Sequence, residues 1–147
     1  MKIFLLTLAM ILPLTLTAET PKEQKVVFDC SSNNFNFVST RFWLIEQSAL
    51  EYKETKTPYK IVLTIHSGCT DVVSQERAKE DKVLQKIQAQ MKALSKEHAV
   101  SIEACQIALD HKKITQKDLL PFVSSVRNSI TRVIALQNDG YAFIPFK

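Results

Sequence analysis

Three cysteines, Cys30, Cys69 and Cys105, are the residues whose type and placement best suit chemistry in this chain. Each lies at, or just beyond, the carboxyl end of a segment that the sequence predicts to be a strand. In an open parallel sheet those ends share one edge, and the crevice outside it is the usual place for a ligand. The three thiols could therefore approach one another. The sequence has no CxxC pair and no Cys/His pair at zinc spacing, so we expect no metal site.

Cys105 is the best candidate for a reactive residue, because it lies between a predicted strand and the start of a predicted helix. Unpaired backbone N–H groups and the positive end of the helix dipole favour a thiolate there. A thiolate can accept sulfur as a persulfide or attack a disulfide. His66 ends the neighbouring predicted strand and is a candidate to support the thiolate or to carry a proton. Cys30 and Cys69 are either small buried hydrophobic residues or accessory thiols.

The elements that must position these residues alternate between strands and helices. Apolar runs rich in β-branched residues predict strands over 26–28, 60–66, 100–105, 122–126 and 141–146. Helical spacing of apolar residues predicts helices over 37–54, 72–96 (with a break near 79–81), 106–110, and from Asn128 or Ser129 to Gly140. Residues 67–69 are predicted to be a turn, and Thr115 with Asp118 has the spacing of a capping box in which Asp replaces Glu. This order predicts an α/β protein, a three-layer α/β/α sandwich with a mainly parallel sheet of about five strands.

The first residues have the layout of a secretory signal peptide. Lys2 is followed by an apolar run from Ile3 to Leu16 and by the small-residue site Thr17-Ala18. The run is shorter than the roughly 20 residues that cross a bilayer. We therefore expect a signal peptide over 1–18, a mature domain over 19–147, a periplasmic or secreted location and no stable membrane insertion. An odd number of cysteines in an exported protein leaves at least one thiol free, modified or paired between chains.

Charge and glycine content exclude two classes of function. The formal charge is +4, falls to +3 when Lys2 leaves with the signal peptide, and comes from scattered lysines. Nucleic-acid binding requires a denser basic stripe, so we expect none. The chain has two glycines and no Gly-rich phosphate loop, and we expect no cofactor.

Several stretches of the sequence resemble a known family. The stretch Glu103 to Ala108 (EACQIA), then Ile114 and Asp118 to Pro121 (DLLP), is similar to the DsrE/DsrF-like sulfur-relay proteins, which carry a Cys after the third strand. The tail from Arg132 to Ile144 resembles the R-I-I-x-L-Q-x-x-G-Y-A-Y-I ending of that family. His66-Ser67-Gly68 resembles its His-Gly turn, with Ser inserted. The resemblance runs from Lys25 to Phe146.

The resemblance implies a flavodoxin-like, DsrE-type sandwich that assembles as trimers or hexamers. In relay members the Cys accepts a sulfane sulfur as a persulfide and passes it to a partner protein, and by position that role falls on Cys105. Relay members work in the cytoplasm, whereas we expect this chain to be exported. Cys30 and Cys69 are outside the family motif and could form a disulfide beside the site.

Three hypotheses follow. The first is a periplasmic sulfur-carrier or sulfurtransferase-like protein that holds sulfane sulfur as a persulfide on Cys105 and exchanges it with a donor or acceptor protein. The second is a non-catalytic oligomer that binds a small ligand in a crevice lined by Cys105. The third is a thiol–disulfide redox protein in which Cys30 or Cys69 resolves Cys105. Whether the protein is an enzyme therefore stays open.

Overall fold

A five-stranded, all-parallel sheet forms the centre of the molecule. The computed structural model describes residues 21–146, so the predicted signal peptide lies outside the described residues. The strands are β1 (Gln24–Cys30), β2 (Tyr59–Ile65), β3 (Ser101–Cys105), β4 (Val123–Val126) and β5 (Ala142–Phe146). Their order across the sheet is β4-β3-β2-β1-β5, and every pair is parallel. The predicted α/β fold class is confirmed.

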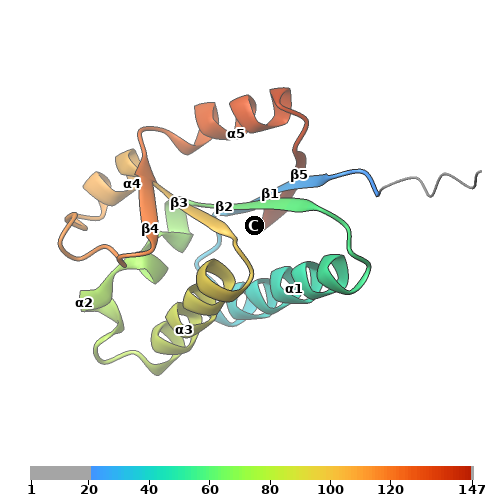
Figure 1. Cartoon of the computed structure of the whole chain (residues 1–147). Helices are drawn as coiled ribbons and strands as arrows, with labels where there is room; N and C mark the ends of the chain where they lie inside the picture. The colour runs from blue at the N-terminus through green and yellow to red at the C-terminus, as the bar shows by residue number, and fades with distance from the viewer. Residues whose placement is uncertain (1–20, 147) are drawn as a thin grey trace, which may run out of the picture.

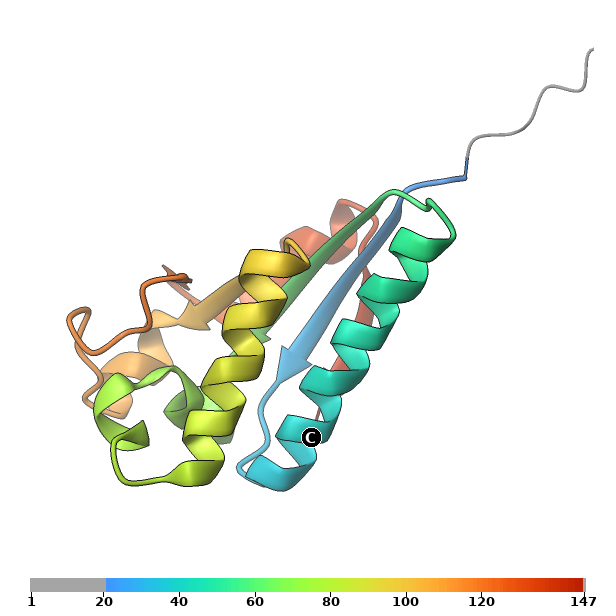
Figure 2. The same cartoon turned by 60° about the horizontal axis from the view of Figure 1, so that its bottom comes forward.

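Helices cover both faces of this sheet, unequally. The long helices α1 (Phe35–Glu54) and α3 (Lys82–Glu97) lie side by side on one face, and α5 (Ser129–Asn138) lies on the other (Figures 1 and 2). The larger apolar core lies under α1 and α3, and it includes Phe42 and Met91. The core under α5 is a small cluster built on Val27 and Val62. The face under α5 therefore has room for polar residues.

Side-chain caps set the helix starts. Asn34 accepts a hydrogen bond from the N–H of Phe37 at the start of α1, and Asn128 caps α5 in the same way. Asp81 accepts from two backbone N–H groups at the start of α3, which separates α3 from the short α2 (Gln75–Ala78). The predicted break near 79–81 is confirmed, because a capping Asp begins a new helix rather than continuing the old one.

Two local predictions are wrong. The segment after β2 is not a short turn but a 3₁₀ helix, η1 (Ser67–Val73), which takes up the first two residues of the predicted second helix because its apolar side chains are buried in the core. Asp118 does not close a capping box with Thr115. Its carboxylate instead accepts hydrogen bonds from the N–H of Glu76 and the hydroxyl of Ser74, and so caps α2 from a distant part of the chain. Within residues 21–146, no helix is both long and apolar enough to cross a membrane.

Because side chains alternate along each strand, the residues at the carboxyl edge of the sheet are divided between its two faces. Cys30, Ile65 and Ala104 lie in one row across three strands, and all three belong to the core under α1 and α3. Neighbouring residues along a strand point to opposite faces. Asp29 and Cys105, each one residue away from that row, therefore point toward the α5 face.

Candidate functional site

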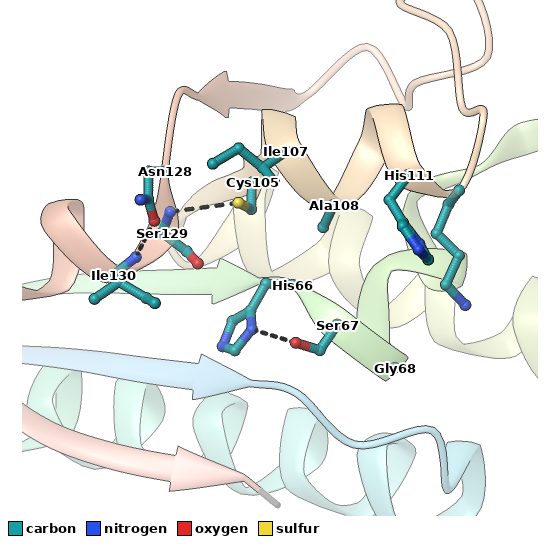
Figure 3. A pocket seen from close by; sticks show the side chains of 11 residues that line it. His66, Ser67, Gly68, Cys105, Ile107, Ala108, His111, Asn128, Ser129 and Ile130 are labelled. Carbon is teal, nitrogen blue, oxygen red and sulfur yellow. Dashed lines mark hydrogen bonds between the residues drawn. The ribbon is translucent and has the colours of Figure 1, made fainter.

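Cys105 lies where two helices begin. It is the last residue of β3 and the N-cap of α4 (Gln106–His111), and it is buried. The backbone N–H of Ser129, the first residue of α5, donates a hydrogen bond to its sulfur at 3.4 Å (Figure 3). The sulfur therefore faces the backbone N–H groups that begin both α4 and α5.

These contacts shift the protonation of the thiol. Burial raises the pKa of Cys105, but hydrogen bonds from the backbone N–H and the hydroxyl of Ser129, and from N–H groups in the first turn of α4, outweigh burial. The pKa of Cys105 is therefore lowered from its usual value. A lowered pKa increases the share of thiolate near neutral pH, and the thiolate is the nucleophilic form.

An ion pair between a half-exposed arginine and a buried carboxylate joins the start of α5 to β3 beside the sulfur. Glu103 is two residues before Cys105 on β3, so both side chains point to the face that α5 covers. The guanidinium of Arg132, on the first turn of α5, donates from Nε and Nη2 to the two carboxylate oxygens of Glu103, both at 2.7 Å. Glu103 is almost fully buried. A paired, planar contact of this kind fixes orientation as well as distance.

The Cys105 sulfur lies at a pocket of about 490 Å³. The pocket runs between the start of η1, α4 and the start of α5, and its lining is predominantly apolar (Figure 3). Its lining residues are His66, Ser67, Gly68, Cys105, Ile107, Ala108, His111, Lys112, Asn128, Ser129 and Ile130. Its size and apolar lining with a few polar groups are those of a small-molecule site.

His66 lines this pocket but is not hydrogen-bonded to the sulfur. Its Nε2 lies 3.1 Å from each carboxylate oxygen of Asp29, and its Nδ1 lies 2.8 Å from the hydroxyl of Ser67. In Figure 3 the ring extends away from Cys105, toward β1. The structure therefore brings both predicted site residues to one pocket and gives the sulfur a different direct partner, Ser129.

Comparison with known proteins identifies the relatives of this chain. The model of the DsrE/DsrF-like family matches residues 25–146. The chain belongs to the DsrE/DsrF-like family. An uncharacterized protein from Aquifex aeolicus is 40% identical over 143 residues, which cover 95% of this chain and 62% of that protein.

Solved structures with low sequence identity share the fold of this DsrE/DsrF-like protein. A protein of unknown function from Methanobacterium thermoautotrophicum has a TM-score of 0.64 and 17% identity, and the match covers 86% of this chain and 99% of that one. The ychN protein from E. coli has a TM-score of 0.53 and 16% identity, with 84% and 99% covered. Identity at this level shows the fold alone.

In this family member, Cys30 and Cys69 are bonded to each other. They form a disulfide, and both are completely buried against the α1 and α3 face. Neither lines the Cys105 pocket, and Cys105 is the free thiol. The three thiols do not converge, because Cys30 and Cys105 occupy opposite faces of the sheet, whereas the disulfide considered between Cys30 and Cys69 is present.

Sequence reasoning missed four contributors to the site. Asp29 and Ser67 contact His66, while Ser129 and Arg132 position the sulfur. Asp29 could have been found by aligning the ends of the first two strands, which pairs it with Thr64, two residues before His66. Ser67 has a backbone φ of 51°, which is uncommon for a residue other than glycine and cannot be read from the sequence.

Proposed function

We propose that this protein carries sulfane sulfur as a persulfide on Cys105. The observation that carries the proposal is the thiol itself, free, with a lowered pKa, hydrogen-bonded by Ser129 and open to a pocket. The Cys105 thiolate attacks the outer sulfur of a donor R–S–SH. A new S–S bond forms to Cys105 as the donor S–S bond breaks, and R–S⁻ leaves. Reversal toward an acceptor thiolate passes the sulfur on.

The arrangement of the other two cysteines supports carriage over internal redox chemistry. Cys30 and Cys69 are each other's partners, so neither can resolve Cys105 until their own bond is broken. A persulfide needs a single thiol, and Cys105 is the one free thiol among residues 21–146. The small-ligand alternative is supported by the size of the pocket, and the experiment below separates it from carriage.

We also propose that the protein works in the periplasm or is secreted. Two features support this proposal: the signal-peptide layout of residues 1–18, and the buried disulfide between Cys30 and Cys69. Disulfides persist in oxidising compartments and are rare in a reducing cytosol. In such a compartment the donor or acceptor would be another exported protein or a small polysulfide.

Assembly into a homo-oligomer, a trimer or hexamer, is part of the same proposal. It is supported by the exposed apolar side chains of Ile130 and Ile134 on α5 and of Phe143 on the edge strand β5, which line one hollow. Exposed apolar residues gathered on one surface are typical of protein–protein contacts. Light scattering on the mature protein and on Ile134→Glu tests it, and a monomeric wild type would contradict it.

Intact mass spectrometry before and after incubation with inorganic polysulfide tests the carrier function. We expect a gain of about 32 Da on the Cys105 peptide that a thiol reductant removes, and no gain in Cys105→Ser. Ser removes the nucleophilic sulfur at similar size, so circular dichroism of this variant should match the wild type. An unmodified Cys105 would support the small-ligand-binding alternative. A peptide in which Cys105 is disulfide-bonded to Cys30 or Cys69, formed by exchange with the existing Cys30–Cys69 bond and so without a change in intact mass, would support the redox alternative.

A further inference from the structure

Asp29, His66 and Ser67 form a hydrogen-bonded chain that the persulfide chemistry above does not use. Both carboxylate oxygens of Asp29 lie 3.1 Å from Nε2 of His66, and Nδ1 of the same ring lies 2.8 Å from Oγ of Ser67. The side chains of His66 and Asp29 are 21% and 16% exposed, so solvent weakens this contact little. Ser67, the last of these three hydrogen-bonded residues, is exposed and lines the Cys105 pocket.

The chemical nature of the three side chains determines which atom donates and which accepts in each of these hydrogen bonds. An ionised carboxylate only accepts hydrogen bonds, so Nε2 of His66 carries a proton and donates it to Asp29. In the neutral ring the other nitrogen, Nδ1, is then an acceptor, and the hydroxyl of Ser67 donates to it. Thr64 also donates to Asp29, from Oγ1 to Oδ1 at 2.6 Å, so this carboxylate accepts a second side-chain hydrogen bond.

The backbone conformation at residues 67 and 68 places the hydroxyl of Ser67 at the pocket. Ser67 has a φ of 51°, and the next residue, Gly68, passes so close to the β1–α1 loop that a Cβ there would lie 2.8 Å from the backbone nitrogen of Asn33. The N–H of Gly68 also donates to the carbonyl of Ser31 at 3.0 Å. A residue held in a sparsely populated backbone region at a pocket is a reason to ask what its side chain does.

We propose that Asp29, His66 and Ser67 are the proton relay of the Cys105 pocket, an inference that rests on the proposed sulfur-carrier function. The Cys105 thiolate attacks R–S–SH, and the proton transfers accompany the breaking of the donor S–S bond, so that R–S⁻ is protonated as it leaves. The persulfide gives its proton to Oγ of Ser67 as the proton of Ser67 moves to Nδ1 of His66. The resulting imidazolium faces the Asp29 carboxylate and returns a proton through Ser67 to R–S⁻.

The net reaction is balanced without an added reductant or oxidant. Cys105–S⁻ and R–S–SH become Cys105–S–S⁻ and R–SH, one sulfane sulfur is transferred, and one proton moves from the persulfide to the leaving thiolate. Asp29 is a positioning residue in this scheme, because it acts through the ring of His66. Ser67 is the group that exchanges protons with the reacting sulfurs.

Single-turnover transfer from cysteine persulfide tests the relay. Ser67→Ala and Asp29→Asn should still load Cys105 to the wild-type extent, but about a hundredfold more slowly, which is the usual contribution of a positioned acid–base group. Alkylation of Cys105 by iodoacetamide should change by less than about twofold, because Ser129 and α4 stabilise the thiolate independently of the relay. Asp29→Asn should also shift the ¹⁵N signals of His66 away from the Nε2–H tautomer.

Matched controls and opposite outcomes make the test decisive. Ser48→Ala, on α1, and Asp139→Asn, at the far end of α5, make the same chemical changes away from the pocket and should leave the transfer rate unchanged. Wild-type rates in Ser67→Ala would overturn the relay while leaving sulfur carriage intact. A wild-type protein that takes up no sulfur would overturn the carrier function and the relay together. Ser67 is exposed, so its variant stays informative even if Asp29→Asn unfolds.

Discussion

The two faces of the sheet use cysteine in opposite ways at the same edge. On the α1 and α3 face, Cys30 is fully buried and bonded to Cys69 within the larger core. On the α5 face, Cys105 is a free thiol at a predominantly apolar pocket, with Glu103 two residues before it and His66 at the same pocket. One residue of strand register separates the two environments. The contrast teaches that the face of the sheet, more than the position at a strand end, decides whether a cysteine is bonded in the core or left as a free thiol at a pocket.

The largest effect should come from removing the structural pair. In the double variant Cys30→Ala/Cys69→Ala, we expect the free energy of unfolding to fall by about 2–4 kcal/mol, because the bond links residues 39 positions apart and constrains the unfolded chain. Urea unfolding measures this change. The pH midpoint of Cys105 alkylation in the folded variant should stay at its wild-type value. A shifted midpoint would show that the two faces are coupled.

The next effect concerns the ion pair that holds α5. Arg132→Met leaves the carboxylate of Glu103 buried without its partner, and we expect a loss of about 2 kcal/mol, below the range for fully buried pairs because Arg132 is 39% exposed. The start of α5 should then shift from the sulfur, and the pKa of Cys105 should rise. Urea unfolding and the pH dependence of alkylation measure the two consequences.

A second substitution, at Glu103, distinguishes the cost of an unpaired buried charge from the loss of the contact that positions α5. Glu103→Gln/Arg132→Met removes both charges, so it should recover part of the lost stability. The pKa of Cys105 should stay raised in this double variant, because the contact that fixes α5 is still missing. A pKa of Cys105 at its wild-type position in both variants would contradict the positioning role of the ion pair.

Much of this arrangement was readable from the sequence. Apolar runs and helical spacing placed all five strands and the long helices, and the position of Cys105 after the third strand made it the candidate thiol, whereas the structure shows that it is the free one. The pairing of Cys30 with Cys69 was not fixed by the sequence, because it depends on η1, whose 3₁₀ geometry comes from burial of Val72 and Val73 rather than from local propensity. The contact from Ser129 joins residues 24 positions apart and depends on how α5 is docked.

A smaller effect tests the direct hydrogen bond to the sulfur. Ser129→Pro removes the N–H that reaches Cys105, at the first position of α5, where proline is well tolerated. Asn128 is already extended, as a residue before proline must be. A hydrogen bond to a charged group contributes about 1.5 kcal/mol. We therefore expect the pKa of Cys105 to rise and alkylation near neutral pH to slow markedly.

Ser129→Ala is the matched control for that variant. It keeps the backbone N–H and removes the hydroxyl alone, so the pKa of Cys105 should rise less than in Ser129→Pro. The pH midpoint of iodoacetamide alkylation should therefore rise from wild type to Ser129→Ala and again to Ser129→Pro. Equal midpoints in Ser129→Pro and wild type would mean that the N–H groups of α4 suffice to hold the thiolate.

The smallest effect is the pH dependence of stability that belongs to Cys105. Its pKa is lowered in the folded protein, so between that value and the ordinary pKa of about 8.5 the unfolded chain binds the proton that the native thiol has released. The free energy of unfolding of wild type, relative to Cys105→Ser, should therefore rise with pH across this window and lose the gain as pH falls through the folded pKa. Urea unfolding at several pH values measures the difference. Ser129→Pro should make this pH dependence shallower, since the same hydrogen bond that lowers the pKa of Cys105 supplies the stability. Removal of the Cys30–Cys69 disulfide should instead lower the free energy of unfolding by the same amount at every pH and leave its slope against pH unchanged.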